Sequence, residues 1–249
     1  MAITYLTQFN SASTVNATSY TTSSISTTSG NLIVVIAAVM TNGGTSDPSP
    51  NITCSDSLTS TYTSVANIGN ASSWSMGFQV FTLVSNGTAR TITIADSIDA
   101  EYQWELIVLE LSGATGTVNG LITNSNAGDN VISLTLTATP TSNDLTLFAR
   151  YIDGGVNGSP PTFTMDAGWD ATIEANSDNT NQGGVLGLSA RTGSTSTTVS
   201  CTDATSATGS YAGGKCIALA LTFVGSGGGE EVAPDYNFDI FSFGMFSIL

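Results

Sequence analysis

The chain has 249 residues, of which 9% are charged, and 19 acidic residues outnumber four basic ones for a net charge of −15. So acidic a chain repels phosphate backbones, which excludes a nucleic-acid partner, and the lack of histidine excludes His-based nucleophile triads and His metal sites. A hydrophobic fraction of 41% is too high for a disordered chain.

Four compact apolar blocks, rich in Val, Ile and aromatic residues, punctuate the chain between clusters of Gly, Asn, Ser and Pro. They span residues 32–40, 78–84, 106–111 and 216–224. Blocks of this length predict strands, and no stretch shows sustained helical periodicity, so the chain is predicted to be all-β. The blocks are too short for membrane helices, and the start MAITYLTQFN lacks the features of a secretory signal. We therefore expect no membrane partner.

An internal repeat organises residues 1–225. Ser29–Val34 aligns with Ser142–Leu147, and Glu105–Gly113 aligns with Ile217–Gly225, at an offset of 112 or 113 residues. Glycine pairs, prolines and a short strand align between these anchors at nearly the same offset. A duplicated structural unit is the simplest interpretation.

The repeat units are predicted to run from about 18 to 113 and from about 131 to 225. Apolar strands packed between alternating ones predict a two-sheet antiparallel β-sandwich or jelly roll over residues 1–225. Spacing leaves open whether the units form one sandwich or two. The lack of a linker favours one, with residues 114–130 as a crossing segment. The predicted core residues are Leu32, Val34, Ile36, Phe81, Ile107, Leu109, Leu147, Leu219 and Leu221.

Candidate chemistry is sparse. Glu105 and Glu110 alternate along one strand, so their carboxylates point to opposite faces and cannot flank one scissile bond. We predict no catalytic residue and no enzyme. Asp and Asn at 129–130, 153–155 and 177–179 could ligate calcium, but such clusters are equally typical of turns, so no metal or cofactor is predicted.

Two further residue types have structural explanations. The three cysteines, an odd number without metal-ligand spacing, are expected as buried thiols; a Cys201–Cys216 bridge requires neighbouring strands. The tryptophans could stack on sugars, although tryptophan borne on a strand is more often part of the core. They are Trp74, Trp104 and Trp169.

The last residues differ in composition from the rest. Residues 226–233 are glycine-rich and predicted to be a flexible linker, and residues 234–249 are rich in aromatic residues and predicted to be a docking tail. An exposed apolar strand needs a docking site, so the tail is predicted to add to a neighbouring subunit or enter a partner's groove. The alternative is an edge strand of its own domain. The predicted assembly residues are Tyr236, Phe238, Ile240, Phe241, Phe243, Phe246 and Leu249.

Three short motifs carry a resemblance to a known module. They are the start Ser29–Val35, the hairpin from Cys54–Ser57 to Tyr62, and the ending Glu110–Gly113. With them the chain resembles a duplicated, jelly-roll-like β-sandwich module of bacteriophage virion proteins and bacterial surface proteins. The resemblance covers most of residues 18–225 and implies a structural or adhesive role, with no catalytic residue to carry over.

The sequence therefore predicts a non-enzymatic structural protein of a bacteriophage, located in the virion. It would serve as a capsid decoration or as a tail or fibre component, and would form a homo-oligomer or bind other virion subunits through its C-terminal strand. The alternatives are a carbohydrate-binding adhesion module, with a glycan as partner, and a subunit of an extracellular filament.

Overall fold

The computed structural model describes residues 2–13, 17–40, 52–70, 76–96, 103–127, 131–153, 163–170, 173–176, 184–203 and 215–226. All regular elements within these ranges are β-strands, and every strand pairing is antiparallel. Over the same ranges, no helix is long and apolar enough to cross a membrane. The prediction of an all-β antiparallel sandwich is confirmed.

The first half of the chain builds two sheets. Five strands form a large sheet, in the spatial order β1 (Thr4–Ser13), β8 (Gln103–Ser112), β3 (Leu32–Met40), β6 (Met76–Val84) and β5 (Thr63–Asn70). Three strands form a small sheet, in the order β2 (Ser19–Thr21), β7 (Ile92–Asp96) and β4 (Ile52–Asp56).

The second half builds the same two sheets again. Its large sheet has the order β9 (Ala114–Ala127), β16 (Lys215–Gly225), β11 (Leu145–Asp153), β14 (Gly184–Thr192) and β13 (Ile173–Asn176). Its small sheet has the order β10 (Val131–Thr135), β15 (Thr198–Asp203) and β12 (Phe163–Met165). Adding eight to each strand number of the first half gives the strand order of the second, so the halves share one topology.

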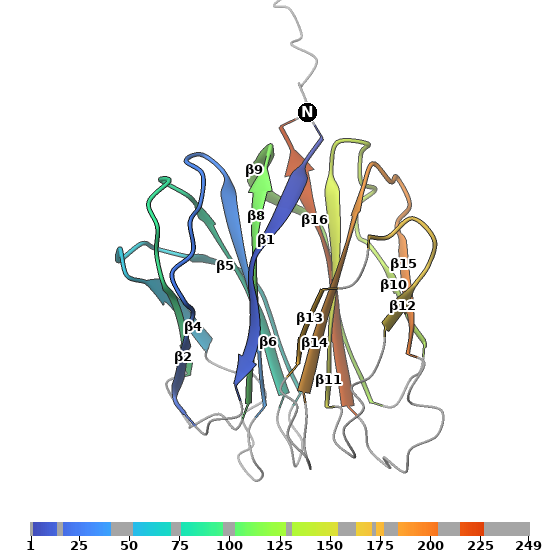
Figure 1. The fold of residues 1–249 in the computed structure, drawn as a ribbon. Helices are drawn as coiled ribbons and strands as arrows, with labels where there is room; N and C mark the ends of the chain where they lie inside the picture. Colours follow the sequence, from blue (N-terminus) through green and yellow to red (C-terminus); the bar gives the residue numbers. More distant parts are fainter. Residues whose placement is uncertain are drawn as a thin grey trace, which may run out of the picture.

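The sheets stack in four layers, with the two large sheets in the middle and a small sheet outside each (Figure 1). Alternate residues of β3 face opposite ways. Leu32, Val34 and Ile36 join a central core that spans both large sheets, whereas Ile33 and Val35 join the outer core of the first half. All nine residues of β3 are buried, because both its faces are covered. This explains the unbroken apolar run in the sequence.

The large sheets meet with an approximate twofold relation. Strand β1 lies against β13, and β5 lies against β9. Since β9 and β13 are the counterparts of β1 and β5, each half presents the same surface to the other, as in an isologous dimer interface. All the core residues predicted from the sequence are buried.

The repeats thus form two sandwiches joined face to face, and not the single interleaved sandwich that the missing linker favoured. The missing linker has another cause. Strand β8 ends at Ser112 and β9 begins at Ala114, and the chain reverses through Gly113, whose φ of 79° suits glycine. The unit boundaries also change, because β1 precedes the predicted start at 18 and β9 occupies the predicted crossing segment.

The cysteine predictions divide. Neither Cys54 nor Cys201 is part of a disulfide, and Cys201 is buried whereas Cys54 is half-buried. Cys201 lies in β15 of the small sheet and Cys216 in β16 of the large sheet, so the strands are not neighbours and no Cys201–Cys216 bridge forms. Burial, helped by the charge of Asp56, raises the pKa of the Cys54 thiol well above its usual range, which makes it a poor nucleophile.

Candidate functional site

The assembly residues predicted in the tail, from Tyr236 to Leu249, lie outside the described residues, as does most of the linker. The last described residue is Ser226, whose backbone N–H donates to the carbonyl of Gly113 over 2.6 Å. The linker therefore leaves the body at the β8–β9 turn. A Cβ placed on Gly113 would lie 3.4 Å from the Ala2 carbonyl oxygen, so the chain also starts beside this point.

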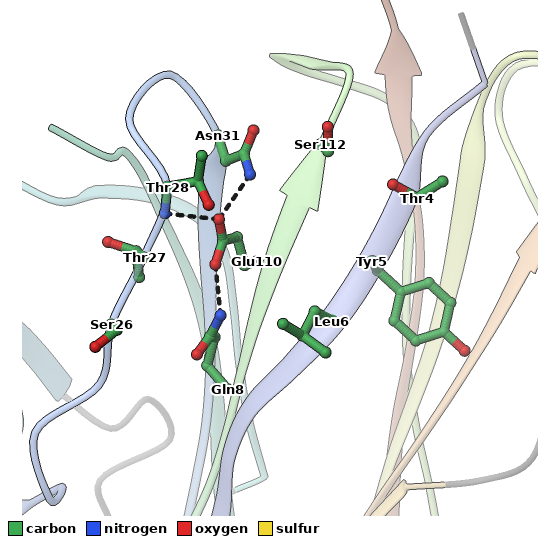
Figure 2. A pocket seen from close by; sticks show the side chains of 10 residues that line it. All are labelled: Thr4, Tyr5, Leu6, Gln8, Ser26, Thr27, Thr28, Asn31, Glu110 and Ser112. Atoms are coloured by element: carbon green, nitrogen blue, oxygen red, sulfur yellow. Dashed lines mark hydrogen bonds between the residues drawn. The ribbon is translucent and has the colours of Figure 1, made fainter. Parts of the chain in front are cut away.

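A pocket of about 470 Å³ opens close to this exit (Figure 2). It lies between the first part of β1, the end of β8 and the segment that leads into β3. Hydroxyl and amide groups dominate its lining, together with one exposed leucine. The lining residues are Thr4, Tyr5, Leu6, Gln8, Ser26, Thr27, Thr28, Asn31, Glu110 and Ser112.

Glu110 anchors this pocket, and it is 5% exposed. Its Oε1 accepts hydrogen bonds from the Thr28 backbone N–H at 2.8 Å and from Asn31 Nδ2 at 2.6 Å, and its Oε2 accepts one from Gln8 Nε2. Burial raises the pKa of Glu110, but these hydrogen bonds outweigh burial and hold the pKa below its usual value. The carboxylate stays ionised at neutral pH and is unsuited to act as a general acid.

A bulge brings Gln8 to this carboxylate. Between Thr7 and Phe9 the register of β1 against β8 shifts by one residue, so Gln8 is the extra residue of the edge strand. The bulge leaves Leu6 opposite Glu110 in the ladder, and the Leu6 side chain is 61% exposed. An exposed leucine therefore lies beside a row of polar groups.

Tyr5, on the other face of β1, ties the two halves together. Its hydroxyl donates to Asp170 Oδ2 over 2.9 Å. Burial and the acceptor carboxylate raise the pKa of Tyr5 to about 12. The phenol therefore stays a donor across the whole neutral range.

The pocket suits a neutral, hydroxyl-rich ligand better than an anion. Gln8 and Asn31 each donate an amide N–H to Glu110, so their side-chain carbonyl oxygens point away from the Glu110 carboxylate, as Figure 2 shows. Those oxygens are acceptors for ligand hydroxyl groups, and the exposed face of Leu6 can cover C–H groups. Ser26, Thr27 and Ser112 add hydroxyls, although Thr27 already shares a 2.6 Å hydrogen bond with Ser85.

The glutamate pair of β8 is arranged as the alternation predicts. Glu110 faces the pocket on the side of the small sheet, whereas Glu105 faces the second half. Glu105 lies near Gly184 there, because a Cβ built on Gly184 would be 2.6 Å from Glu105 Oε1. The two carboxylates lie on opposite faces of one strand. They do not form a pair that could work on one substrate.

A buried ion pair between Asp56 and Arg90 lies at the small sheet of the first sandwich, where Asp56 ends β4 and Arg90 precedes β7. The Arg90 guanidinium lies 2.9 Å from Asp56 Oδ2, and the two side chains are 1% and 0% exposed. Asp56 Oδ1 also accepts the backbone N–H groups of Leu58 and Ser60, each at 2.9 Å. Burial raises the pKa of Asp56, but the hydrogen bonds from Ser60, Leu58 and Arg90 prevail and lower it. Asp56 thus holds the β4–β5 loop.

The other ligand hypotheses find little support. Trp104 is fully buried and donates its Nε1–H to the Ala17 carbonyl, and Trp169 packs edge-on against Phe148; Trp74 lies outside the described residues. The two described tryptophans therefore offer no shared sugar-stacking surface. The calcium-loop candidates also fall outside the description, apart from the backbone of Asp153. Within the described ranges, no three Cys, Asp or Glu residues gather to hold a metal.

Comparison with known proteins finds no match to a family model, to a curated protein or to a solved structure.

The sequence analysis does not predict the contact of Glu110 with Gln8 and Asn31. A signal for it was present: Asn31 and Glu110 lie inside the repeat anchors, and Asp144 and Thr222 stand at the matching positions of the second unit. Because these two positions differ together between the repeats, the alignment marks them as candidates for a contact.

Proposed function

We propose that this chain is a non-enzymatic structural protein of a bacteriophage virion, a capsid decoration or a tail or fibre component, that assembles through its C-terminal segment. The observation that carries the proposal is the aromatic segment 234–249 behind a glycine-rich linker, which begins where β16 ends. The other copies of the chain, or neighbouring virion subunits, are its proposed partners.

The use of charge inside the body supports a structural role. Asp56, Arg90 and Glu110 are buried and bonded to loops of their own sandwich, so their charges hold the fold together. The pKa values of Asp56 and Glu110 are both lowered, whereas a general acid working at neutral pH needs a raised one.

Assembly energetics favour the tail as the connecting element. Burying one large apolar side chain contributes about 1.5–3 kcal/mol, and ordering one backbone residue costs about 1–2 kcal/mol, so the aromatic anchors offset much of the entropy that the tail loses on docking. An extended segment can dock by adding a strand to an exposed sheet edge, or by filling a groove with alternate side chains. Either mode requires only the tail to change on binding.

Size-exclusion chromatography with light scattering tests this proposal. Three forms are compared: the full chain, a chain ending at Gly228, and a full-length variant with Phe238, Phe241 and Phe243 changed to serine. We expect a defined oligomer or filament only for the unaltered chain, with the same circular dichroism for all three. Identical monomers in all three cases would contradict the role of the tail in self-assembly. Open-ended filaments would identify the filament subunit instead.

A carbohydrate-binding adhesion module is the second candidate, and the Glu110 pocket favours it. Its acceptor oxygens and the exposed Leu6 match the hydroxyl and C–H groups of a saccharide. A glycan array tests this with Leu6→Ser and with Val84→Ser as matched control, because both side chains are 61% exposed and only Leu6 lines the pocket. Binding lost only in Leu6→Ser supports adhesion, and equal binding by both variants rejects this pocket.

A further inference from the structure

A second pocket, of about 480 Å³, lies in the second half of the chain where β14 ends. The loop after β12 and the turn between β14 and β15 form its walls. Its lining combines one arginine with one aspartate, several hydroxyls and small residues. These residues are Asp166, Ala167, Gly168, Arg191, Thr192, Gly193, Ser194, Ser196 and Thr198.

Arg191 is a buried cation that has no ionic partner among the described residues. It is 8% exposed, and its guanidinium carbon lies 4.5 Å from the centre of the Trp169 ring. One N–H donates to the Ser196 carbonyl over 3.0 Å, and Nε is buried and has no hydrogen-bond partner in the part of the chain that the structure describes. Among the described residues, no carboxylate lies within ion-pair distance of this guanidinium. Burial lowers the pKa of Arg191, against an opposing effect of Asp166.

In the first half, a buried arginine has a carboxylate partner within the same sandwich. There Arg90 meets Asp56, the last residue of β4, over 2.9 Å. The repeat aligns β4 with β12 through Ile52 and Phe163, which places Ala167 at the position of Asp56. In the second half a buried arginine also lies beside the corresponding loop, but it comes from β14, at the position of Leu83 and not of Arg90. A methyl group stands at the position aligned with Asp56, and a cavity lies beside the guanidinium.

Leaving a charge unpaired inside a protein is costly, and a guanidinium suits the planar fork of a carboxylate or the oxygens of a phosphate. We propose that this pocket binds an oxyanion, the carboxylate or phosphate group of a ligand, against Arg191. The ligand group gives Arg191 a negative partner, as Asp56 does for Arg90 at a different position of the first half. The hydroxyls of Ser194 and Thr198 line the same space and can donate to the remaining oxygens.

Asp166 opposes this binding and so provides a second test. It lines the pocket, is exposed, and hydrogen-bonds the hydroxyl of Ser200. As the sole carboxylate among the lining residues it repels an incoming anion, together with the net charge of −15. Removing it should tighten anion binding, whereas removing Arg191 should abolish it.

The test is an NMR titration of the full-length chain with inorganic phosphate and, separately, with acetate, at a constant ionic strength of about 0.15 M, which screens the net charge. We expect saturable shifts of the Gly168, Gly193 and Ser194 amides. Arg191→Gln should abolish them, Arg191→Lys should weaken them, and Asp166→Asn should tighten binding several-fold. The stronger of the two probes identifies the oxyanion that the pocket prefers.

Three results would overturn the proposal: no saturable shift with either anion, unchanged binding in Arg191→Gln, or weaker binding in Asp166→Asn. Unchanged resonances outside the pocket serve as the control for folding in each variant. If Arg191→Gln does not fold, Arg191→Lys and Asp166→Asn still decide the question, because their predicted effects have opposite signs.

Discussion

The two halves share one topology but fix the turn before their central strand with different side chains. In the first half the Asn31 N–H donates to the Thr28 carbonyl over 3.2 Å, and in the second the Asp144 N–H donates to the Thr141 carbonyl over 3.1 Å. The backbone turn is thus the same. The Thr28 N–H donates to Glu110 on β8, whereas the Thr141 N–H donates to Asp144 of its own turn over 2.8 Å.

This exchange has a consequence for the surface. Where the first half has Glu110, the second has Thr222, which pairs with the hydroxyl of Thr146. In the second half the segment that leads into the turn, around Ala138, passes close to β9. A Cβ built on Gly120 of β9 would lie only 3.2 Å from the Ala138 carbonyl oxygen. The first half has its hydroxyl-lined pocket at the corresponding place. Backbone pairing and apolar packing therefore preserve the fold. The polar side chains that fix the turns differ in position between the halves, and so do the pockets beside them.

The largest expected difference between the halves concerns their buried charges. Asp56→Ala leaves Arg90 buried and unpaired, and should lower the free energy of unfolding by about 3–5 kcal/mol. Asp166→Ala, in the exposed part of the corresponding loop, should change it by about 0.5 kcal/mol or less. Urea unfolding of both variants measures this contrast, and equal losses would contradict the assignment of Asp56 as the loop anchor.

The central core should treat the halves alike. Leu109 and Leu221 occupy equivalent positions on β8 and β16 and are both buried in the core between the large sheets. Replacing either by alanine removes buried methyl groups and should cost about 2–5 kcal/mol. Thermal unfolding should show similar losses for the two variants. A negligible loss for one of them would contradict the alignment of the repeats.

The two turn anchors should be similar in strength. Glu110→Gln and Asp144→Asn each replace a charge-assisted hydrogen bond to a turn N–H, worth about 1.5–3 kcal/mol, by a neutral one worth about 0.5–1.5 kcal/mol. Hydrogen exchange of the Thr28 amide should accelerate in the first variant, and that of the Thr141 amide in the second. Faster exchange of both amides in both variants would show that the anchors are not local.

Acid should destabilise the chain mainly through carboxyl groups of the first half. The pKa values of Asp56 and Glu110 are lowered by folding, so their stabilisation is complete above the unfolded values of about 3.9 and 4.3 and is lost as the pH falls through the folded values. In the second half burial raises the pKa of Glu174, which gives the opposite sign. Unfolding measured from pH 7 to 2 should show a loss below about pH 4 that shrinks in an Asp56→Asn, Glu110→Gln double variant. An unchanged acid loss in that variant would contradict these assignments.

The smallest expected effect is that of Arg191→Met, which keeps the packing on Trp169 but loses the cation–π contact and one hydrogen bond. The expected cost is about 1 kcal/mol, less than for Asp56→Ala, because no ion pair is broken. Urea unfolding measures it, and a loss as large as that of Asp56→Ala would indicate a hidden partner.

The sequence predicts the buried strands well and the edge strands poorly. Strands β3, β8 and β16 are apolar on both faces, so their residues alone reveal them. Strands β1 and β9 lie at sheet edges and are rich in Thr, Ser and Asn, which gives no periodic signal; their formation depends on pairing with β8 and β16. Both therefore lie outside the predicted repeat units.

The Glu110 pocket depends on distant pairing in the same way. Glu110 reaches Thr28 and Asn31 because β8 pairs with β3 and sets Glu110 opposite Ile33, and it reaches Gln8 because of the bulge in β1. Neither the register nor the bulge can be read from residue spacing. The repeat could have suggested the contact through the exchange of Asn31 and Glu110 for Asp144 and Thr222, but not its geometry.

The joint between the two sandwiches is tested most directly by hydrogen–deuterium exchange of the Leu221→Ala variant, followed by mass spectrometry. Because the central core spans both large sheets, the two halves should unfold as one unit, and the slowest amides of β3 and β11 should lose protection by the same factor. Loss of protection in β11 with wild-type protection in β3 would contradict a single body and show that the sandwiches are independent.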